Sequence, residues 1–268
     1  MAITSEEDQT AAFREFDALF NLRSVENEAF HLVQYLKPDS RIIDMGCGIG
    51  SITFDLARRV PHGYVLGVDF SAGSIATAKA QAKAAGLTNV EFIQGDAMDL
   101  PSSIPSNSFD ISHSHQVLLH LPDPVKALKS ILRVVKPGGI LTTRDNHSRF
   151  VYPLTPAMSR NFELYEIWSR ERGCNPNAGH FNHIWMHEAG TPWDAISAGD
   201  SARSFCDIPS KRIVANTFGR GFAATYDKVL DSEEDKKWFD ELRREFLEWA
   251  EKPESRLAWY DGWVIGKK

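Results

Sequence analysis

A glycine-rich turn carries the first sign of chemistry in this sequence. The segment Asp44-Met45-Gly46-Cys47-Gly48-Ile49-Gly50 places an acid two residues before three glycines spaced G-x-G-x-G. Glycines let a backbone turn sharply and approach a ligand with no Cβ in the way. The dinucleotide fingerprint spaces its glycines G-x-G-x-x-G, but Ser51 stands where its third glycine would be. The spacing therefore disfavours a nicotinamide oxidoreductase. A turn that merely joins a strand to a helix stays an alternative.

Further acids stand at the ends of the apolar runs that follow the turn. Asp69 ends the second run, about 20 residues downstream, where a carboxylate can accept hydrogen bonds from both hydroxyls of a ribose. Asp96 follows the third run, directly before Ala97. Asp44, Asp69 and Asp96 thus end successive runs, which favours a ligand site over a plain turn. Asp110 lies at the opposite end of its run, and we expect it to be a structural acid.

The acid followed by G-x-G-x-G resembles the first motif of the class I S-adenosylmethionine-dependent methyltransferases. The resemblance implies an α/β fold with a Rossmann-like doubly wound sheet of seven strands, S-adenosylmethionine as cofactor, and methyl transfer as the activity. It also implies that Asp69 binds the ribose, Asp96 the adenine amino group and the backbone of Ala97 a ring nitrogen, while the end of the fourth strand lines the methionine part. The implied cofactor-binding residues are Asp44, Gly46, Cys47, Gly48, Gly50, Asp69, Phe70, Ser71, Asp96, Ala97, Ser114, His115 and Gln116.

Within that family, the sequence is most similar to the ubiquinone and menaquinone biosynthesis methyltransferases. Gly95-Asp96-Ala97 with Leu100-Pro101 following, and the turn Arg133-Val134-Val135-Lys136-Pro137-Gly138-Gly139, carry this likeness. It covers residues 24–146 strongly and residues 152–190 more weakly. Thr191 follows Gly190 where an aromatic residue is usual in the family.

The chemistry implied by this cofactor asks little of the protein. The methyl group is carried on a sulfonium, a good leaving group, so the protein mainly aligns a nucleophile and excludes water. A base matters only if the acceptor is protonated, as an alcohol or phenol is. His115, at the carboxyl end of a predicted strand, is the leading candidate for that base, with alignment alone as the alternative. Arg144-Asp145 ends the next strand and could orient a substrate or form a structural ion pair, which makes Asp145 a second catalytic candidate.

Seven of the nine histidines fall between His113 and His187, a concentration that could supply a metal site. His180, His183 and His187 would share one face of a helix. However, no HExxH arrangement is present, and Glu188 is the one neighbouring acid at ligand spacing. We therefore expect no metal.

Aromatic residues after the predicted fifth strand could cover an apolar acceptor. A helical spacing of three of them is equally what ordinary core packing would give, so a lid and a core remain alternatives. These residues are Phe150, Tyr152, Phe162, Tyr165 and Trp168. The acceptor we expect is a small apolar or aromatic metabolite.

The elements that must position these residues follow from the apolar pattern. From residue 41, short apolar runs bounded by Gly or Asp alternate with helical stretches, which indicates βαβ units around a parallel sheet. Strands are predicted at residues 41–45, 64–69, 90–95, 109–115 and 139–144. A helix with one apolar face is predicted at residues 125–135, ended by the Lys136-Pro137-Gly138-Gly139 turn. Right-handed crossovers place helices on both faces of such a sheet.

Further helices are expected outside the sheet. They comprise a helix capped by Ser5 that carries Phe13 and Phe16, and helices at residues 24–36, 157–172, 180–189 and 232–250, before a closing strand at residues 258–265. We expect a single methyltransferase domain over residues 1–268. In it, residues 1–38 form N-terminal covering helices, residues 39–146 the cofactor-binding core, and residues 147–268 an acceptor-side helical lid and closing strands.

Composition bounds the partners and the compartment. The chain has 268 residues and a formal net charge of −6, which argues against binding nucleic acid through overall charge. The sequence has neither the basic, apolar start of a signal peptide nor the apolar run of about 20 residues that a membrane span needs. Three cysteines without CxxC spacing fit a reducing compartment, so a cytoplasmic location is expected. A small-molecule acceptor is the expected partner, and a non-catalytic protein that binds S-adenosylmethionine for regulation or scaffolding is the alternative.

Overall fold

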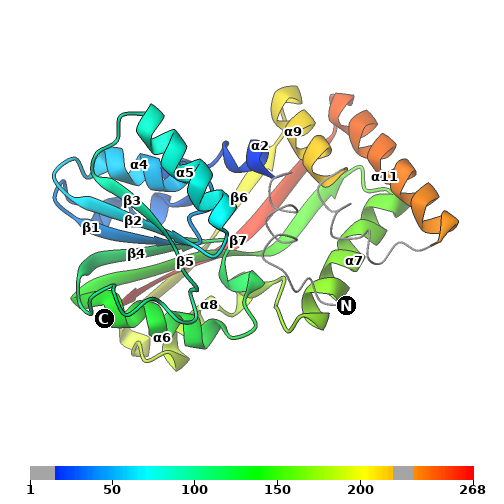
Figure 1. Ribbon diagram of the computed structural model, residues 1–268. Coiled ribbons are helices and arrows are strands. Elements are labelled where there is room, and N and C mark those ends of the chain that lie inside the picture. Colours follow the sequence, from blue (N-terminus) through cyan, green and yellow to red (C-terminus); the bar gives the residue numbers. More distant parts are fainter. Residues whose placement is uncertain (1–15, 220–231) are drawn as a thin grey trace. The chain divides into compact units, whose positions relative to one another are not determined.

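Seven strands form one sheet in the order β3-β2-β1-β4-β5-β7-β6 (Figure 1). This computed structural model describes residues 16–219 and 232–268. The first five strands pair in parallel, β1 with β2 and β4, β2 with β3, and β4 with β5. The strands are β1 (Arg41–Met45), β2 (Tyr64–Asp69), β3 (Val90–Gln94), β4 (Phe109–His115), β5 (Val135–Tyr152), β6 (Ile196–Phe205) and β7 (Arg256–Lys267). This arrangement confirms the predicted doubly wound α/β sheet.

Helices connect the strands, and their first residues explain where several of them begin. Ser71, Asp123 and Thr155 each accept a hydrogen bond from a backbone N–H in the first turn of the helix that follows. The α-helices are α2 (Asp17–Phe20), α3 (Val25–Glu28), α4 (Ser51–Arg59), α5 (Ala72–Ala84), α6 (Pro124–Val134), α7 (Pro156–Glu171), α8 (Asn182–Glu188), α9 (Ile208–Phe218) and α11 (Glu233–Glu251). Short 3₁₀ helices are η1 (Phe30–Tyr35), η2 (Leu118–His120), η3 (Ala178–His180) and η4 (Trp193–Ala195). No helix among the described residues is long and apolar enough to cross a membrane.

Alternation along the strands divides the core into two layers. Ile42 and Val65 pack in a cluster with Leu56 of α4, whereas their neighbours Ile43 and Leu66 pack in another cluster with residues of α6 and α8. Successive side chains of a strand point to opposite faces, so a sheet buried on both sides has such continuous apolar runs. In Figure 1, α4 and α5 accordingly lie on one face of β1–β4, and α6 and α8 on the other.

Contacts divide the chain into two compact units. The core unit comprises Arg23–His147, Gly173–Ser201 and Asp261–Lys268, and it contains the glycine turn and the ends of β1–β4. The second unit comprises Met1–Leu22, Ser148–Arg172 and Ala202–Tyr260, and its own apolar cluster joins α7, α9 and α11. Strands β5, β6 and β7 each contribute residues to both units. The single-domain organisation stays a prediction.

The N-terminal segment departs from the predicted helices. The expected helix at residues 24–36 is instead two short pieces, α3 and η1, because Ala29 leaves the helical region at φ −131° and ψ 23°. The capping box of Ser24 and Asn27 starts α3 as a normal helix, but Glu28 at its end turns its carboxylate into a buried ion cluster. The helix predicted from Ser5 lies largely outside the described residues. Its described part is α2.

Strand β5 is longer than predicted, at both ends. The Lys136-Pro137-Gly138-Gly139 segment does not form a turn between α6 and the strand, because α6 ends at Val134 and β5 begins at the next residue. The pairing with β4 shifts register between Phe109 and Ile111, and Gly138 adopts a positive φ of 76° there. A bulge therefore absorbs the glycines within the strand. The other predicted strands and helices are confirmed to within a few residues at their ends.

Candidate active site

Three loops meet at the carboxyl ends of β1, β2 and β3, and backbone hydrogen bonds tie them together. The N–H groups of Gly46 and Cys47 donate to the carbonyl of Val68 at 2.7 and 3.1 Å. The N–H of Gly95 donates to the carbonyl of Asp69 at 2.9 Å. The glycine turn, Asp69 and Asp96 therefore lie on adjoining loops of the core unit.

The glycines of the turn are required for two different reasons. Gly46, Gly48 and Gly50 all have positive φ, at 66°, 53° and 92°, which side chains rarely tolerate. A Cβ on Gly46 would lie 2.3 Å from Val117 Cγ2, so this glycine permits close packing. A Cβ on Gly48 would meet no heavy atom within 4 Å. The backbone of Gly48 thus borders open space that a ligand can approach.

Asp69 organises the loop that faces this space. Its Oδ2 accepts from the N–H of Gly48 at 2.8 Å, and its Oδ1 accepts from the N–H of Ser71 at 2.9 Å. Burial raises the pKa of Asp69, the two backbone hydrogen bonds oppose that rise, and the charge of Asp44 adds to it. Phe70 beside it is half exposed, and Ser71 is buried as the cap of α5.

Asp96 and Ala97 occupy the third loop. Asp96 Oδ1 accepts from the N–H of Met98 at 2.8 Å, which fixes the loop in a tight turn. Ala97 is buried in the apolar cluster that also holds Val68. The orientation of this loop is therefore set by local backbone contacts before any ligand binds.

Asp44 differs from the other two acids because both of its oxygens are used within the protein. Oδ2 accepts from the hydroxyl of Thr53 at 2.5 Å, and Oδ1 lies 2.7 Å from Nδ1 of His113. The side chain is buried between β1, α4 and β4. These contacts support the glycine turn from beneath, and a direct cofactor contact by Asp44 stays a prediction.

The end of β4 turns sharply after His115. Ser114 and His115 are both buried, and Gln116 has a positive φ of 56°. The N–H of Gln116 donates to the carbonyl of Arg144 at 2.8 Å, and its side-chain amide donates to Asp261 Oδ1 at 3.1 Å. This loop is therefore held against β5 and β7.

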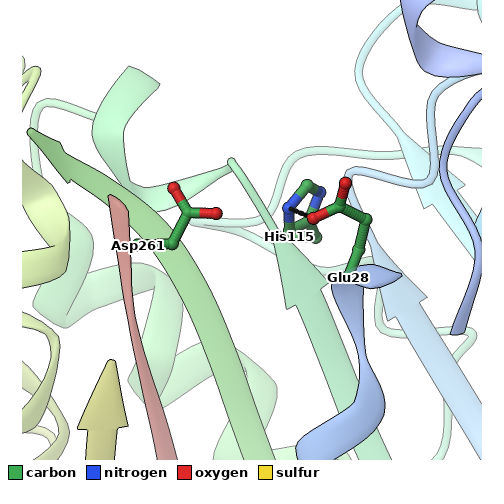
Figure 2. Close-up of side chains that lie close together, drawn as sticks. All are labelled: Glu28, His115 and Asp261. Atoms are coloured by element: carbon green, nitrogen blue, oxygen red, sulfur yellow. Dashed lines mark ion pairs between the residues drawn. The ribbon is translucent and has the colours of Figure 1, made fainter. Parts of the chain in front are cut away.

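A buried ion cluster lies at these strand ends, which we call the Arg144 cluster: Glu28, His115, Arg144 and Asp261. Arg144 Nη1 lies 3.1 Å from Glu28 Oε2, and its Nη2 lies 2.8 Å from Asp261 Oδ2. His115 Nε2 lies 3.2 Å from the same oxygen of Glu28. Figure 2 shows the His115 ring facing the Glu28 carboxylate, with Asp261 on β7, which lies beyond β5 in the sheet. Arg144 is fully buried, so its positive charge needs the compensation that these two carboxylates provide.

One of the two predicted alternatives was an ion pair between Arg144 and Asp145. The structure does not show this pair. Asp145 instead accepts from the hydroxyl of Thr143, the N–H of Leu119 and the amide of Asn182. Its side chain is fully buried, and burial raises its pKa to about 6 against the lowering effect of these hydrogen bonds. Asp145 therefore joins β5, η2 and α8, while Arg144 belongs to the separate Arg144 cluster.

The histidines of α8 are engaged with aromatic neighbours. The rings of His187 and Trp193 stack at 4.2 Å, and His183 lies 6.3 Å from Trp193. His180 faces the ring of His147 at 4.7 Å. Within the described part of the chain, the one group of side chains spaced to hold a metal ion is Glu28, His115 and Asp261.

The predicted roof residues belong to the second unit. Phe162 and Tyr165 pack against its apolar cluster, and Trp168 contacts Tyr165 at 6.2 Å between ring centres. Phe150 and Tyr152 are more exposed. The described contacts of Phe162 and Tyr165 are those of core residues, and a covering role for this segment stays a prediction.

Sequence reasoning missed Glu28 and Asp261. Glu28 lay inside an expected amphipathic helix, where an acid is normally solvated. Asp261 interrupts the aromatic strand Trp259-Tyr260-Asp261-Gly262-Trp263, and an acid inside such a strand implies a buried partner. Arg144 is likewise a charged residue inside an apolar strand. The two signals together could have indicated an ion pair of Arg144 with Asp261, but they give no indication of Glu28.

The residues present fit the nucleoside part of S-adenosylmethionine. The open space over Gly48 gives backbone access, and the Asp69 carboxylate beside it is oriented by two N–H donors. Carboxylates at strand ends are the groups that bind ribose hydroxyls in α/β nucleotide sites. The chemistry of this donor set therefore suits S-adenosylmethionine.

Comparison with known proteins agrees with this geometry. The model of the methyltransferase domain family matches residues 36–238. An uncharacterized methyltransferase of Schizosaccharomyces pombe is 30% identical over 260 residues, covering 92% of this chain and 91% of that protein. The demethylmenaquinone methyltransferase of Bacillus cytotoxicus is 31% identical over 198 residues, covering 71% of this chain and 78% of that protein. The solved structure of the YcgJ protein from Bacillus subtilis shares the fold, with a TM-score of 0.58 and 17% identity over 89% of this chain and 97% of that chain. The chain therefore belongs to the methyltransferase domain family and is an S-adenosylmethionine-dependent methyltransferase that resembles the menaquinone group.

Proposed function

We propose that this enzyme methylates a small, uncharged aromatic or apolar metabolite, with the methyl donor held at the carboxyl ends of β1–β4. The observation that carries the donor site is the Asp69 carboxylate, oriented by the N–H groups of Gly48 and Ser71 beside the open space over the turn. The ribose hydroxyls would be bound by Asp69 and the adenine by Asp96, Ala97 and Phe70. The methionine part would lie against the glycine turn and residues 114–116.

Two observations support an uncharged acceptor. First, the charge of Arg144, the buried cation at these strand ends, is already balanced by Glu28 and Asp261, so it is not available to bind an acceptor carboxylate. Second, the demethylmenaquinone methyltransferase to which the chain is similar is named for an apolar aromatic acceptor. A reduced quinone or a phenol fits both observations.

The protein's share of the chemistry is to orient the acceptor and to receive its proton. Bound S-adenosylmethionine supplies an electrophilic methyl group, and transfer to an O–H, N–H or C–H acceptor releases one proton. His115 at the end of β4 is the residue we assign to receive that proton. Asp145 is left out of this role because its carboxylate already accepts hydrogen bonds from three donors of the protein.

The proposal is tested with methyl-labelled S-adenosylmethionine and two kinds of acceptor. One is a reduced demethylmenaquinone with a short prenyl tail, and the other is an aromatic carboxylate of similar size. We expect labelled product by mass spectrometry from the uncharged acceptor and little or none from the carboxylate. Faster conversion of the carboxylate, or donor binding without conversion of either, would overturn the proposed acceptor class.

A further inference from the structure

The two ring nitrogens of His115 have different surroundings, because only Nε2 lies next to a carboxylate. Its side chain is 6% exposed, at the end of β4. Both ring nitrogens are buried, and neither makes a hydrogen bond of normal geometry among the described residues, but Nε2 lies 3.2 Å from Glu28 Oε2. A buried polar atom without a partner costs free energy, so such atoms in folded proteins call for a functional explanation.

Glu28 decides which nitrogen carries the proton. An ionised carboxylate accepts hydrogen bonds and donates none, so the nitrogen that faces it is the protonated one. The guanidinium of Arg144, whose Nη1 lies 3.1 Å from the same oxygen, favours the charged form of this carboxylate. Arg144 is itself anchored by Asp261 and by the carbonyl of Asn27. The Nε2–H tautomer then leaves a lone pair on Nδ1.

Burial, together with two nearby cations, favours the neutral form of this ring. Burial lowers the pKa of His115 to about 4, Glu28 opposes the decrease, and Arg23 and Arg144 add to it. The ring of His31 is a further titratable neighbour, and it is also buried. A neutral ring does not repel a sulfonium. A ring that has taken a proton faces the carboxylate of Glu28, which stabilises the imidazolium.

We propose that Glu28 is a positioning residue that holds His115 in its Nε2–H tautomer, so that Nδ1 receives the acceptor's proton during methyl transfer. This inference rests on the proposed role of His115. The methyl carbon forms a bond to the acceptor atom as its bond to sulfur breaks and leaves the electron pair on sulfur. The acceptor's proton moves to Nδ1, and the imidazolium, paired with Glu28, later releases it to water.

The alternative use of these side chains is a divalent cation held by Glu28, His115 and Asp261. Their ligand atoms lie within 4.8 Å of one another. Both carboxylates already contact Arg144, however, and a cation between them would have to displace a fully buried guanidinium. The contacts therefore favour the pair of Glu28 and His115 over a metal site.

The tautomer can be tested without any acceptor. Long-range ¹H–¹⁵N spectra of ¹⁵N-histidine-labelled enzyme, with His115 assigned by its loss in His115→Asn, should show a protonated Nε2 and an unprotonated Nδ1 at pH 7. Glu28→Gln should shift these signals towards a mixture of tautomers. Asp261→Asn is the matched control, because it removes Arg144's other carboxylate and leaves Glu28 facing His115, so the tautomer should persist. An Nδ1–H tautomer in the wild type, or equal shifts in both variants, would overturn the proposal, as would broadening of the His115 signals by added Mn²⁺.

Kinetics with the reduced short-tail demethylmenaquinone separate positioning from a structural role. We expect Glu28→Gln to lower kcat by about 10- to 100-fold with unchanged affinity for the donor, and His115→Asn to lower it by about 10²- to 10⁴-fold. Glu28→Gln should add nothing further in the His115→Asn background, because both changes act on one proton transfer. Additive losses would contradict the proposal.

If Glu28→Gln does not fold, the tautomer of His115 in the wild type still tests the proposal by itself. An enzyme with the expected tautomer that does not turn over this acceptor would refute the acceptor class and leave the pairing intact.

Discussion

At the scale of single residues, the three strand-end acids of the proposed donor site make different contacts. Asp44 uses both oxygens on Thr53 and His113 and supports the turn. Asp69 and Asp96 use theirs on backbone N–H groups of the loops themselves. A carboxylate fixed by backbone donors is oriented before the ligand arrives, which reduces the entropy cost of binding. Under the proposed function, the ribose would therefore meet a preorganised hydrogen-bond acceptor.

Replacing this carboxylate should cost donor affinity specifically. We expect Asp69→Ala to weaken S-adenosylmethionine binding by about 10- to 100-fold in calorimetry, since hydrogen bonds to a charged group are worth roughly 1.5–3 kcal/mol. Asp110→Ala is the matched control, because Asp110 lies at the opposite end of β4 and serves Arg41 and Lys136. Unchanged affinity in a folded Asp69→Ala protein would remove the ribose assignment.

At the scale of elements, the glycine turn combines a packing requirement with an access requirement. Gly46→Ala places a Cβ 2.3 Å from Val117 at a positive φ, and should lower the free energy of unfolding by roughly 2–4 kcal/mol in urea denaturation.

The Cβ of Gly48→Ala meets no neighbouring atom, so its backbone strain should lower the free energy of unfolding by only about 1–2 kcal/mol. Its methyl group enters the open space over the turn, and donor affinity should fall. A Gly48→Ala protein with undiminished donor affinity would contradict the placement of the donor against this backbone.

Asp145 joins β5 to η2 and α8, and its raised pKa predicts how the free energy of unfolding changes with pH. The folded protein holds the pKa of Asp145 near 6, above the unfolded value of 3.8, so between these values the folded state binds more protons than the unfolded state. The unfolding free energy of the wild type, relative to Asp145→Asn, should therefore fall as pH rises from about 4 to 6, by roughly 3 kcal/mol, and stay constant above that.

The control for this measurement has the opposite sign. Burial of Asp110 tends to raise its pKa, but hydrogen bonds from Lys136 and from the backbone of Arg41 outweigh it and lower the pKa below 3.8. Relative to Asp110→Asn, the wild type should become more stable as pH rises through the acid range. A relative stability that does not change with pH for Asp145→Asn would show that burial does not raise the pKa of this carboxyl.

At the scale of the whole molecule, the sequence predicted what depends on local pattern. Strands β1–β4 and α6 followed from apolar periodicity, and the convergence of the three loops after β1, β2 and β3 followed from Gly and Asp at the ends of those strands. The break at Ala29 and the bulge at Gly138 were not predicted, because tertiary contacts decide them. The Arg144 cluster was not predicted either, since it joins side chains from α3, β4, β5 and β7 that no local pattern relates.

We propose that the donor binds at the carboxyl ends of β1–β4. Hydrogen–deuterium exchange of the whole chain, with and without S-adenosylhomocysteine, tests it directly because no acceptor is needed. Ligand binding should slow exchange together at residues 44–50, 69–71, 95–97 and 114–116, while α11 of the second unit serves as the internal reference. If calorimetry shows binding but exchange in these four segments is unchanged, or if protection falls elsewhere, the account is contradicted.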